Sequence, residues 1–230
     1  MSSISVIIPT FNEEVGIANI IKHLLTCDGP IPEILVIDGG STDNTLKRAS
    51  NAGAKTFSSP GKGRAIQMNY GASKSNGEIL YFVHADCLPP TSFPRDIDQA
   101  VKNGFGLGRY RTKFLSSKLL LKINAFFTRF DWFICYGGDQ TLFMKKSLFQ
   151  SIGGYREEMR IMEDYDIIVR ARKLELYKIM EGNALVSARK YDYNSWYKVL
   201  KANSTIIRMY KNNATQSEMV DTYKRLLHFR

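Results

Sequence analysis

The chain has 230 residues, of which 44% are hydrophobic and 23% are charged, so its composition is that of a folded protein and excludes a disordered one. A chain of this length is expected to form one large domain around a single core. The net charge of +10 favours phosphorylated ligands, nucleic acid or an anionic membrane surface, but charge alone does not choose among them.

The first predicted elements are a strand over residues 4–8 and a helix that follows it. Thr10 and Glu13 have the spacing of a capping box, which predicts that the helix begins there. The core face of this helix consists of apolar residues at helical spacing, namely Ile17, Ile20, Ile21, Leu24 and Leu25.

Apolar runs and helical patterns continue to alternate through the first half of the chain. We expect strands over residues 34–37, 55–58 and 79–83, and helices after residue 45 and over residues 64–73. Strands that alternate with helices indicate parallel β-α-β units. The predicted fold is therefore α/β, with a doubly wound, mostly parallel central sheet flanked by helices.

In the second half of the chain, the residue pattern predicts fewer strands than in the first. Residues 109–136 are basic and aromatic and read as mixed strand and amphipathic helix; charges interrupt the stretch, which falls short of the roughly 20 apolar residues of a membrane span. The remaining predicted elements are a strand over 139–144 and helices over 147–152, 163–174, 196–210 and 217–229. We expect residues 1–190 to form the main domain and residues 191–230 a helical extension packed on it.

The three cysteines, Cys27, Cys87 and Cys135, are widely spaced and form no CxxC or Cys/His cluster. The sequence therefore predicts neither a disulfide framework nor a zinc site. The first residues run directly into a strand and lack the basic region and long apolar run of a signal peptide. We expect a cytoplasmic protein.

Carboxylates follow three of the predicted strands: Glu13 or Glu14 after the first, Asp38 after the second and Asp86 after the apolar run 79–83. In open α/β sheets, ligands bind outside the carboxyl ends of the strands. The convergence of these acids predicts a ligand site at this edge. Each acid alone is explained nearly as well by a turn or a helix cap.

Several motifs, in order, are similar to those of family 2 glycosyltransferases with the GT-A fold. They are Ser5 to Glu14 (SVIIPTFNEE), Val36 to Thr45 (VIDGGSTDNT), Gly63 to Ala72 (GRAIQMNYGA), His84-Ala85-Asp86, Gly137 to Gln140 (GGDQ), Gly153-Gly154-Tyr155 and Met162-Glu163-Asp164. The resemblance covers about residues 4–190 and implies an inverting transferase that uses a nucleotide diphosphate sugar.

The resemblance implies a nucleotide-sugar site built from seven residues. Of these, Pro9, Thr10, Asn12 and Glu13 border the nucleoside, Asp38 accepts a hydrogen bond from the base or ribose, and Gly63 and Arg64 lie near the diphosphate. A buried acceptor such as Asp38 penalises a ligand without a matching donor by about 1–3 kcal/mol. A single Gly-x-Gly is by itself a weak phosphate signal.

By the same resemblance, Asp86 is the last acid of the family's DxD motif and bridges a divalent cation to the donor phosphates. Mg²⁺ or Mn²⁺ suits such oxygen ligands. His84 occupies the position of the first acid, which is a departure from the motif. His84 is then either a ligand that favours Mn²⁺, a contact of phosphate or sugar, or a residue at the strand end without a ligand role.

Glu163 and Asp164 match the acidic pair that carries the catalytic base, and Asp164 is the expected base. A cap at the start of a helix is the alternative role. Asp139 and Gln140 are expected on the acceptor side. The Gln-x-x-Arg-Trp motif of processive synthases is absent, so transfer of a single sugar is expected. Arg189 and Lys190 stand in the corresponding region, where their charges would meet either the diphosphate or a surface.

The resemblance thus predicts a metal-dependent glycosyltransferase with a nucleotide-sugar donor and an unknown hydroxyl acceptor, and no nucleic-acid partner. The alternatives are a nucleotidyltransferase, which the acidic first turn disfavours, and a non-catalytic nucleotide-sugar-binding protein. The basic, aromatic segment 109–129 also suggests peripheral association with the inner face of a membrane. A partly buried helix on the acceptor side explains the segment equally well.

Overall fold

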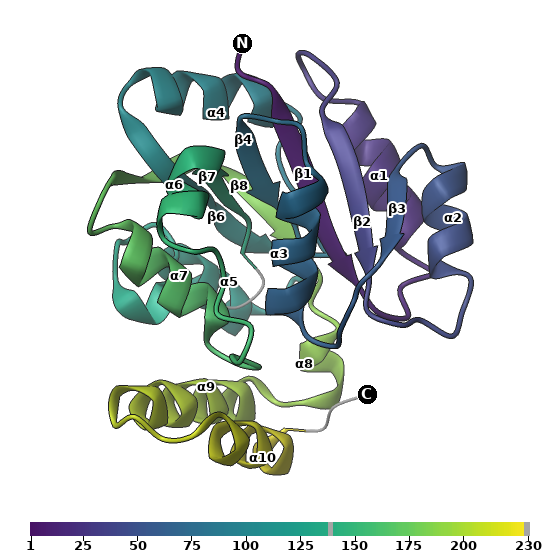
Figure 1. Ribbon diagram of the computed structural model, residues 1–230. Helices are drawn as coiled ribbons and strands as arrows, with labels where there is room; N and C mark the ends of the chain where they lie inside the picture. Colours follow the sequence, from purple (N-terminus) through teal and green to yellow (C-terminus); the bar gives the residue numbers. More distant parts are fainter. Residues whose placement is uncertain (138–139, 228–230) are drawn as a thin grey trace.

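The computed structural model describes residues 1–137 and 140–227 of the chain. Figure 1 shows a central sheet with helices on both faces and the C-terminal helices at one end. The strands are β1 (Ile4–Thr10), β2 (Glu33–Asp38), β3 (Lys55–Ser58), β4 (Ile79–Phe82), β5 (Cys87–Leu88), β6 (Phe105–Phe114), β7 (Leu142–Lys145) and β8 (Leu176–Val186). The predicted α/β class is therefore confirmed.

Helices connect most of the strands. They are α1 (Ile17–Leu25), α2 (Thr45–Asn51), α3 (Arg64–Lys74), α4 (Phe93–Lys102), α5 (Leu119–Phe127), the 3₁₀ helix η1 (Phe133–Cys135), α6 (Lys146–Ser151), α7 (Glu163–Ala171), α8 (Lys190–Tyr193), α9 (Trp196–Lys211) and α10 (Gln216–Leu226). Within the described ranges, no helix is long and apolar enough to cross a membrane.

The described strands form one sheet in the order β3-β2-β1-β4-β7-β6-β8-β5. The pairs among β1, β2, β3 and β4 are parallel, as is the pair β6–β8, whereas β7 runs antiparallel to both of its neighbours and β5 antiparallel to β8. The carboxyl ends of the parallel strands therefore meet at one edge. In Figure 1, α8, α9 and α10 lie at the end of the molecule toward which β1 and β2 run.

Alternation of side chains along the strands divides the core into two clusters. Val6 and Ile8 of β1 belong to the cluster that α1, α2 and α4 cover, whereas Ile7 belongs to the cluster that α3, α6 and α7 cover. This second cluster also includes Ile206 of α9 and Met219 of α10. The C-terminal helices thus bury apolar side chains in the same core as the sheet, because their apolar stripes face it.

The structure corrects the predicted start of the first helix. Thr10 is the last residue of β1 and pairs in register with Asp38, and α1 begins only at Ile17 after the cap residue Gly16, which makes no side-chain cap bond. The capping-box prediction was therefore wrong. The spacing of Thr10 and Glu13 matched the motif, but the strand pairing takes precedence over the local pattern.

Other predicted boundaries shifted, and several elements were missed. The strand expected over 139–144 is β7, Leu142–Lys145, and the helix expected over 163–174 ends at Ala171. The sequence analysis did not predict α4 or the long strand β8. Polar residues interrupt the alternation of β8, whose pairing with β6 also shifts register between Tyr110 and Arg111.

Candidate functional site

The turns that follow β1 and β2 are linked by hydrogen bonds at the edge of the sheet. The Asn12 backbone N–H donates to Ser41 Oγ at 2.8 Å, and the Thr42 N–H donates to Asn12 Oδ1 at 2.9 Å. Asn12 has a φ of 54°, in the left-handed region that asparagine tolerates better than most residues. The Glu13 N–H in turn donates to Thr45 Oγ1 at 2.8 Å. The two loops therefore form one rigid rim.

Asp38 lies at the base of this rim and is 3% exposed. Its Oδ2 accepts the backbone N–H groups of Gly40 and Ser41 at 3.0 and 2.8 Å, and its Oδ1 accepts the Ser41 hydroxyl. A carboxylate has about four lone-pair sites. Asp38 therefore shapes its own turn and retains capacity for one further donor.

Gln67 is a functional candidate that the sequence analysis missed. Its side-chain amide is buried and donates to the carbonyls of Thr10 and Ile37 at 2.9 and 2.7 Å. These carbonyls lie at the ends of β1 and β2. Since Arg64 lies three residues before Gln67 on α3, both side chains lie on the same face of the helix. Gln67 thereby fixes the N-terminus of α3, with Arg64, at the carboxyl edge of the sheet.

Arg64 joins the predicted diphosphate side to the predicted catalytic pair. Its Nε donates to Glu163 Oε1 at 2.7 Å, the Nη2 group contacts the same oxygen, and Nη2 lies 3.4 Å from Asp164 Oδ2. The side chain of Glu163 is 1% exposed and that of Asp164 is 14% exposed. Asp164 is thus the more accessible acid of the pair, and the buried Glu163 carboxylate fixes the position of the Arg64 guanidinium.

The backbone just before this pair is strained. Met162, which caps α7, has a φ of 68°, a conformation unusual for a residue with a long side chain, and it is buried. Such strain persists only where the surrounding structure imposes it and is enriched at functional sites.

Tyr155 is also buried beside the acids. Desolvation, together with the negative charges of Asp164 and Glu163, holds the pKa of Tyr155 well above its usual value.

Asp86 lies on a tight turn after β4, in which the Cys87 N–H donates to the His84 carbonyl at 3.1 Å. The side chain of Asp86 is 28% exposed, and its Oδ2 lies 3.9 Å from Nη2 of Arg189. The same guanidinium nitrogen lies 3.1 Å from each carboxylate oxygen of Glu13. Arg189 thus links the ends of β1 and β4. The sequence analysis left the diphosphate and a surface open as contacts of this arginine and did not count it among the site residues.

The fit of a divalent cation depends on Asp86. Among residues 1–137 and 140–227, no three His, Cys, Asp or Glu side chains lie close enough to form a metal cage. Mg²⁺ sites commonly use one or two carboxylates, with water and substrate phosphates completing the shell. A partly exposed carboxylate at a strand end fits a cation that arrives with a diphosphate. His84 lies on the same turn, two residues before Asp86.

Of the two residues predicted on the acceptor side, the structure describes Gln140. Gln140 Nε2 donates to the Cys135 carbonyl at 2.8 Å, which fixes the segment before β7 against η1. Asp139 lies outside the described residues. Pro9 lies near the end of β1, and Gly63 is the cap of α3, where its φ of 128° requires glycine.

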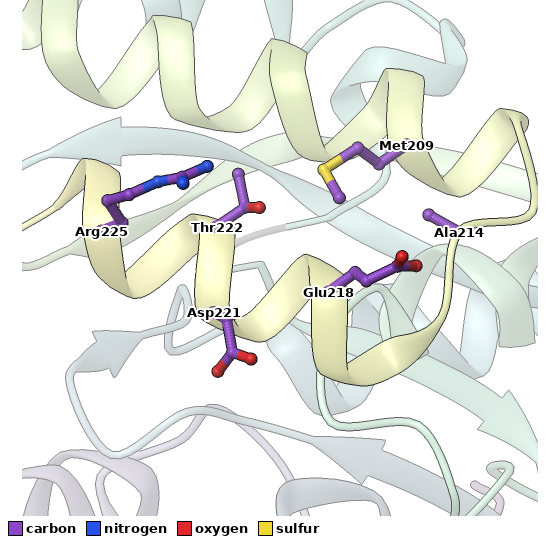
Figure 2. A pocket seen from close by; sticks show the side chains of 6 residues that line it. All are labelled: Met209, Ala214, Glu218, Asp221, Thr222 and Arg225. Atoms are coloured by element: carbon purple, nitrogen blue, oxygen red, sulfur yellow. The ribbon is translucent and has the colours of Figure 1, made fainter.

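A shallow hollow between α9 and α10 lies apart from these residues. Figure 2 shows the Met209 side chain reaching from α9 toward α10. The hollow is lined by Met209, Ala214, Glu218, Asp221, Thr222 and Arg225. Since it includes no residue of the predicted site, it adds nothing to the candidate chemistry.

Comparison with known proteins identifies the family. Residues 5–146, more than half of the chain, match the model described as glycosyl transferase family 2. The chain belongs to this family. The matched region begins in β1, continues through the turns with Asp38 and Asp86, and ends at the start of α6. The family predicted from the motifs is therefore confirmed.

A curated family relative is the glucosyl-3-phosphoglycerate synthase of Mycolicibacterium paratuberculosis, 37% identical over 99 residues, which are 38% of this chain and 30% of that protein. Protein RfbJ of Shigella flexneri is 35% identical over 102 residues, covering 44% of this chain and 78% of that protein. The chain thus matches less than a third of the length of the first of these relatives.

A solved structure extends the fold similarity over almost the whole chain. The mannosyltransferase PcManGT of Pyrobaculum calidifontis, in complex with GDP-Man and Mn²⁺, superposes with a TM-score of 0.70 at 14% identity, covering 98% of this chain and 70% of that one. At this identity the likeness establishes the fold alone. The predicted GT-A-like architecture is confirmed.

Proposed function

We propose that this family 2 member is an inverting glycosyltransferase that moves one sugar from a nucleotide diphosphate sugar to a hydroxyl of an unknown acceptor. The observation that carries the proposal is the placement of Arg64 between the strand ends and the Glu163–Asp164 pair. One group thereby connects the edge where a nucleotide would bind to the acids where a proton would be removed.

In this proposal the rim of Asn12 and Glu13 borders the nucleoside, along with Pro9 and Thr10 at the end of β1. The remaining acceptor capacity of buried Asp38 selects a donor group on the base or ribose. Gly63 lets the backbone approach the phosphates. Two solved structures of similar fold support a nucleotide-sugar donor. PcManGT is in complex with GDP-Man, and the Staphylococcus aureus protein TarS is in complex with UDP-GlcNAc.

A divalent cation, Mn²⁺ or Mg²⁺, would be held by Asp86 and would stabilise negative charge on the departing diphosphate. The Mn²⁺ in the PcManGT complex supports this assignment. His84 is the proposed second contact on the same turn. Arg64 and Arg189 add positive charge beside the position proposed for the phosphates.

The proposed chemistry is a single displacement. Asp164 takes the proton of the acceptor hydroxyl while its oxygen bonds to the anomeric carbon, and the bond from that carbon to the diphosphate oxygen breaks. The nucleoside diphosphate leaves with the electron pair, so the configuration at the sugar carbon is inverted. Glu163, too buried to meet the acceptor directly, positions Arg64 and Asp164. Asp139 and Gln140 are proposed for the acceptor side.

Residues 1–190 are the proposed catalytic unit, with residues 191–230 as a helical extension; the burial of Ile206 and Met219 in the shared core supports this arrangement. The proposed location is the cytoplasm at the inner face of a membrane. The net charge of +10 and the basic, aromatic segment 109–129 support it.

The test is release of UDP or GDP from UDP-glucose, UDP-GlcNAc and GDP-mannose with Mn²⁺, with and without candidate acceptors. We expect Asp86→Ala and Asp164→Asn to lower turnover by roughly 10²–10⁴-fold. Asp221→Asn, at an exposed residue of α10, is the matched control. Full activity in both site variants would refute the residue roles.

If the protein binds one of these donors but releases no UDP or GDP with any acceptor, the non-catalytic alternative is favoured instead. The configuration of the product, read by NMR coupling at the anomeric carbon, tests inversion separately. Retention of configuration would contradict the single displacement even if transfer occurs.

A further inference from the structure

Helix α5 exposes an apolar face that the rest of the described chain does not cover. Leu121 is the one α5 side chain buried in the structure described here, whereas a helix packed on a core usually buries three or four per two turns. The exposed apolar residues, between 41% and 69% exposed, are Leu119, Leu120, Ile123, Phe126, Phe127 and the neighbouring Trp132. Together these six residues are named the α5 surface.

The members of the α5 surface form one patch rather than scattered contacts. Leu119, Ile123, Phe126 and Phe127 have the i, i+4, i+7, i+8 spacing of one helix face. The Phe127 ring lies 5.9 Å from Trp132 in a stacked arrangement and 5.7 Å from Phe126. Exposed apolar patches of this kind mark surfaces that bind a protein or a membrane.

Positive charges surround the α5 surface. Lys113, Lys118, Lys122 and Arg129 are exposed, and the guanidinium of Arg129 lies 3.9 Å from the centre of the Phe126 ring. Two acids lie close to these cations: Asp131 forms a 2.7 Å ion pair with Arg172, and Asp192 lies 3.7 Å from Lys118 Nζ. The cations outnumber the two acids. The rim of the patch is therefore cationic and complements an anionic partner.

The charges distinguish two possible occupants. A second copy that docked through the same patch would form a two-fold interface, in which each cationic rim faces an identical one. Like charges in such an interface repel. An anionic bilayer accepts apolar side chains at the acyl boundary and cations at the headgroups, which matches both features of the patch.

The α5 surface is firmly mounted on the domain. Thr128 Oγ1, at the end of α5, accepts the backbone N–H of Thr112 in β6 at 2.9 Å. The fully buried Arg109 donates to the Phe130 carbonyl at 3.3 Å. Because its supports lie in the core, the patch is displayed as a fixed feature and not as a loose loop.

Residues that flank the α5 surface at both ends contact neighbours of the proposed site residues. At one end, Tyr165 Oη, next to Asp164 in sequence, donates to the Ile134 carbonyl at 3.3 Å. At the other end, Lys118 Nζ donates to the Tyr191 carbonyl at 3.0 Å, two residues after Arg189. A surface bound to the patch would therefore lie beside the groups proposed for transfer.

We propose that the α5 surface docks the protein on the surface of an anionic phospholipid bilayer. The apolar residues enter the interface, and Lys118, Lys122 and Arg129 contact the headgroups. This inference specifies the membrane contact of the proposed location and is independent of the transfer reaction, since docking requires no donor, cation or acceptor.

The test is co-sedimentation of the full chain with vesicles of phosphatidylcholine alone or of phosphatidylcholine mixed with phosphatidylglycerol, whose anionic headgroups attract basic segments. We expect binding to the anionic vesicles that weakens between low and physiological salt, and much weaker binding to the neutral ones. No binding to anionic vesicles at low salt, or equal binding to both, would overturn the proposal.

Variants locate the contact. Ile123→Ser with Phe127→Ser, and separately Lys118→Gln with Lys122→Gln, should each weaken binding by roughly tenfold or more. The matched controls, Ile31→Ser with Leu174→Ser and Lys47→Gln with Lys173→Gln, change exposed residues of the same kinds elsewhere and should bind as wild type. Equal loss in controls and patch variants would overturn the assignment of the surface.

A spectroscopic readout is independent of sedimentation. In a Trp196→Phe background, Trp132 is the remaining tryptophan, and its emission should shift to the blue on addition of anionic vesicles. Concentration-dependent dimerisation that the Ile123→Ser, Phe127→Ser variant abolishes, without vesicle binding, would show that a second copy occupies the patch and would refute the membrane proposal.

Discussion

The guanidinium of Arg189 lies 3.9 Å from the carboxylate of Asp86 and 3.1 Å from both oxygens of Glu13. Arg189 follows β8, whereas the two acids follow β4 and β1. One positive charge that follows the last strand therefore lies between two acids from the first half of the chain. Because Asp86 is the proposed ligand of the cation, Arg189 and a divalent ion compete for the same carboxylate.

Replacing Arg189 should raise the affinity for the cation and lower the apparent affinity for the donor. Arg189→Ala is expected to tighten Mn²⁺ binding without donor by about two- to fivefold, the range of an exposed ion pair, and to raise the donor KM because a charge near the diphosphate is lost. Paramagnetic resonance of free Mn²⁺ measures the first effect. Arg208→Ala, an exposed arginine of α9, is the control, and unchanged or weaker Mn²⁺ affinity would contradict the competition.

The buried Glu163 makes Arg64 important for stability as well as for the site. In Arg64→Ala the nearly inaccessible Glu163 carboxylate loses its cation, and we expect a loss of about 2 kcal/mol in the free energy of unfolding, below the usual cost for a fully buried pair because Arg64 is 41% exposed. Asp164→Asn, at an accessible acid, should cost less than about 1 kcal/mol.

Urea denaturation compares the variants of this pair. The double variant Arg64→Ala, Glu163→Gln should recover part of the loss, since the buried charge is removed with its partner. If the two changes simply add, the ion pair does not account for the stability effect. If Asp164→Asn destabilises as much as Arg64→Ala, its loss of turnover cannot be assigned to the chemistry.

Gln67 offers a separate test of the sheet edge. Gln67→Glu places an acid against the carbonyls of Thr10 and Ile37, where the amide now donates at 2.9 and 2.7 Å. We expect a loss of about 2–3 kcal/mol in unfolding free energy at neutral pH, because two acceptors lose their donor. The exposed Gln99→Glu is the control, and calorimetry gives the measurement. Equal stability of the two variants would show that Gln67 does not tie the strands together.

Local patterns predicted much of the first half of the fold. Apolar runs of strand length and the helical spacing of Ile17, Ile20 and Ile21 depend on near neighbours, and the structure has the corresponding β1, β2 and α1. Asp38 and Asp86 were also expected at the edge of the sheet, because each follows its apolar run within three residues. Such features need no knowledge of distant partners.

The contacts that complete the site depend on partners far away in sequence. Gln67 reaches carbonyls 57 and 30 residues earlier, and Arg189 and Glu13 are 176 residues apart. No spacing rule relates such residues. The same cause explains the failed capping box, since Thr10 is fixed by its pairing with Asp38 on another strand and not by Glu13.

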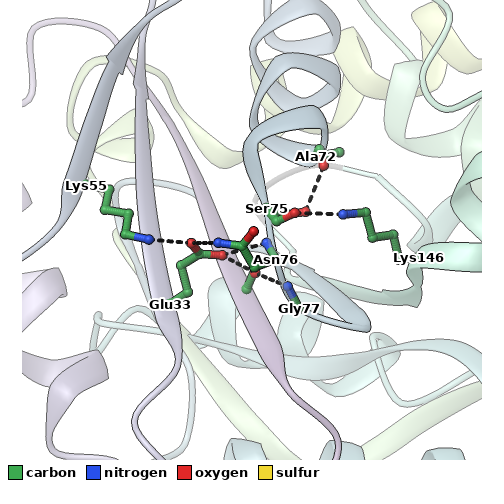
Figure 3. A network of polar contacts seen from close by, with 8 residues as sticks. Glu33, Lys55, Ala72, Ser75, Asn76, Gly77 and Lys146 are labelled. Carbon is green, nitrogen blue, oxygen red and sulfur yellow. Dashed lines mark hydrogen bonds and ion pairs between the residues drawn. The ribbon is translucent and has the colours of Figure 1, made fainter.

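Glu33, at the end of β2 opposite the site, should make stability depend on acid pH. Figure 3 shows its carboxylate among Lys55, Asn76 and Gly77. Partial burial raises its pKa, but hydrogen bonds from Lys55, Ser5 and the Asn76 N–H outweigh this effect and lower the pKa to about 2. The unfolded value is about 4.3, so the folded state gains stability above that pH and loses it as pH falls toward 2.

Glu33→Gln should therefore destabilise the protein by about 2 kcal/mol at pH 6, a magnitude reduced from that of the full pKa shift because Lys55 is 59% exposed. The difference from wild type should shrink as pH is lowered from about 6 to about 3.5, because only wild type loses the contribution of this carboxylate. Urea titrations at each pH measure this difference in unfolding free energy, and Glu181→Gln, at an exposed residue, is the control. A difference that stays constant over this range would show that Glu33 stabilises through packing and not through its charge.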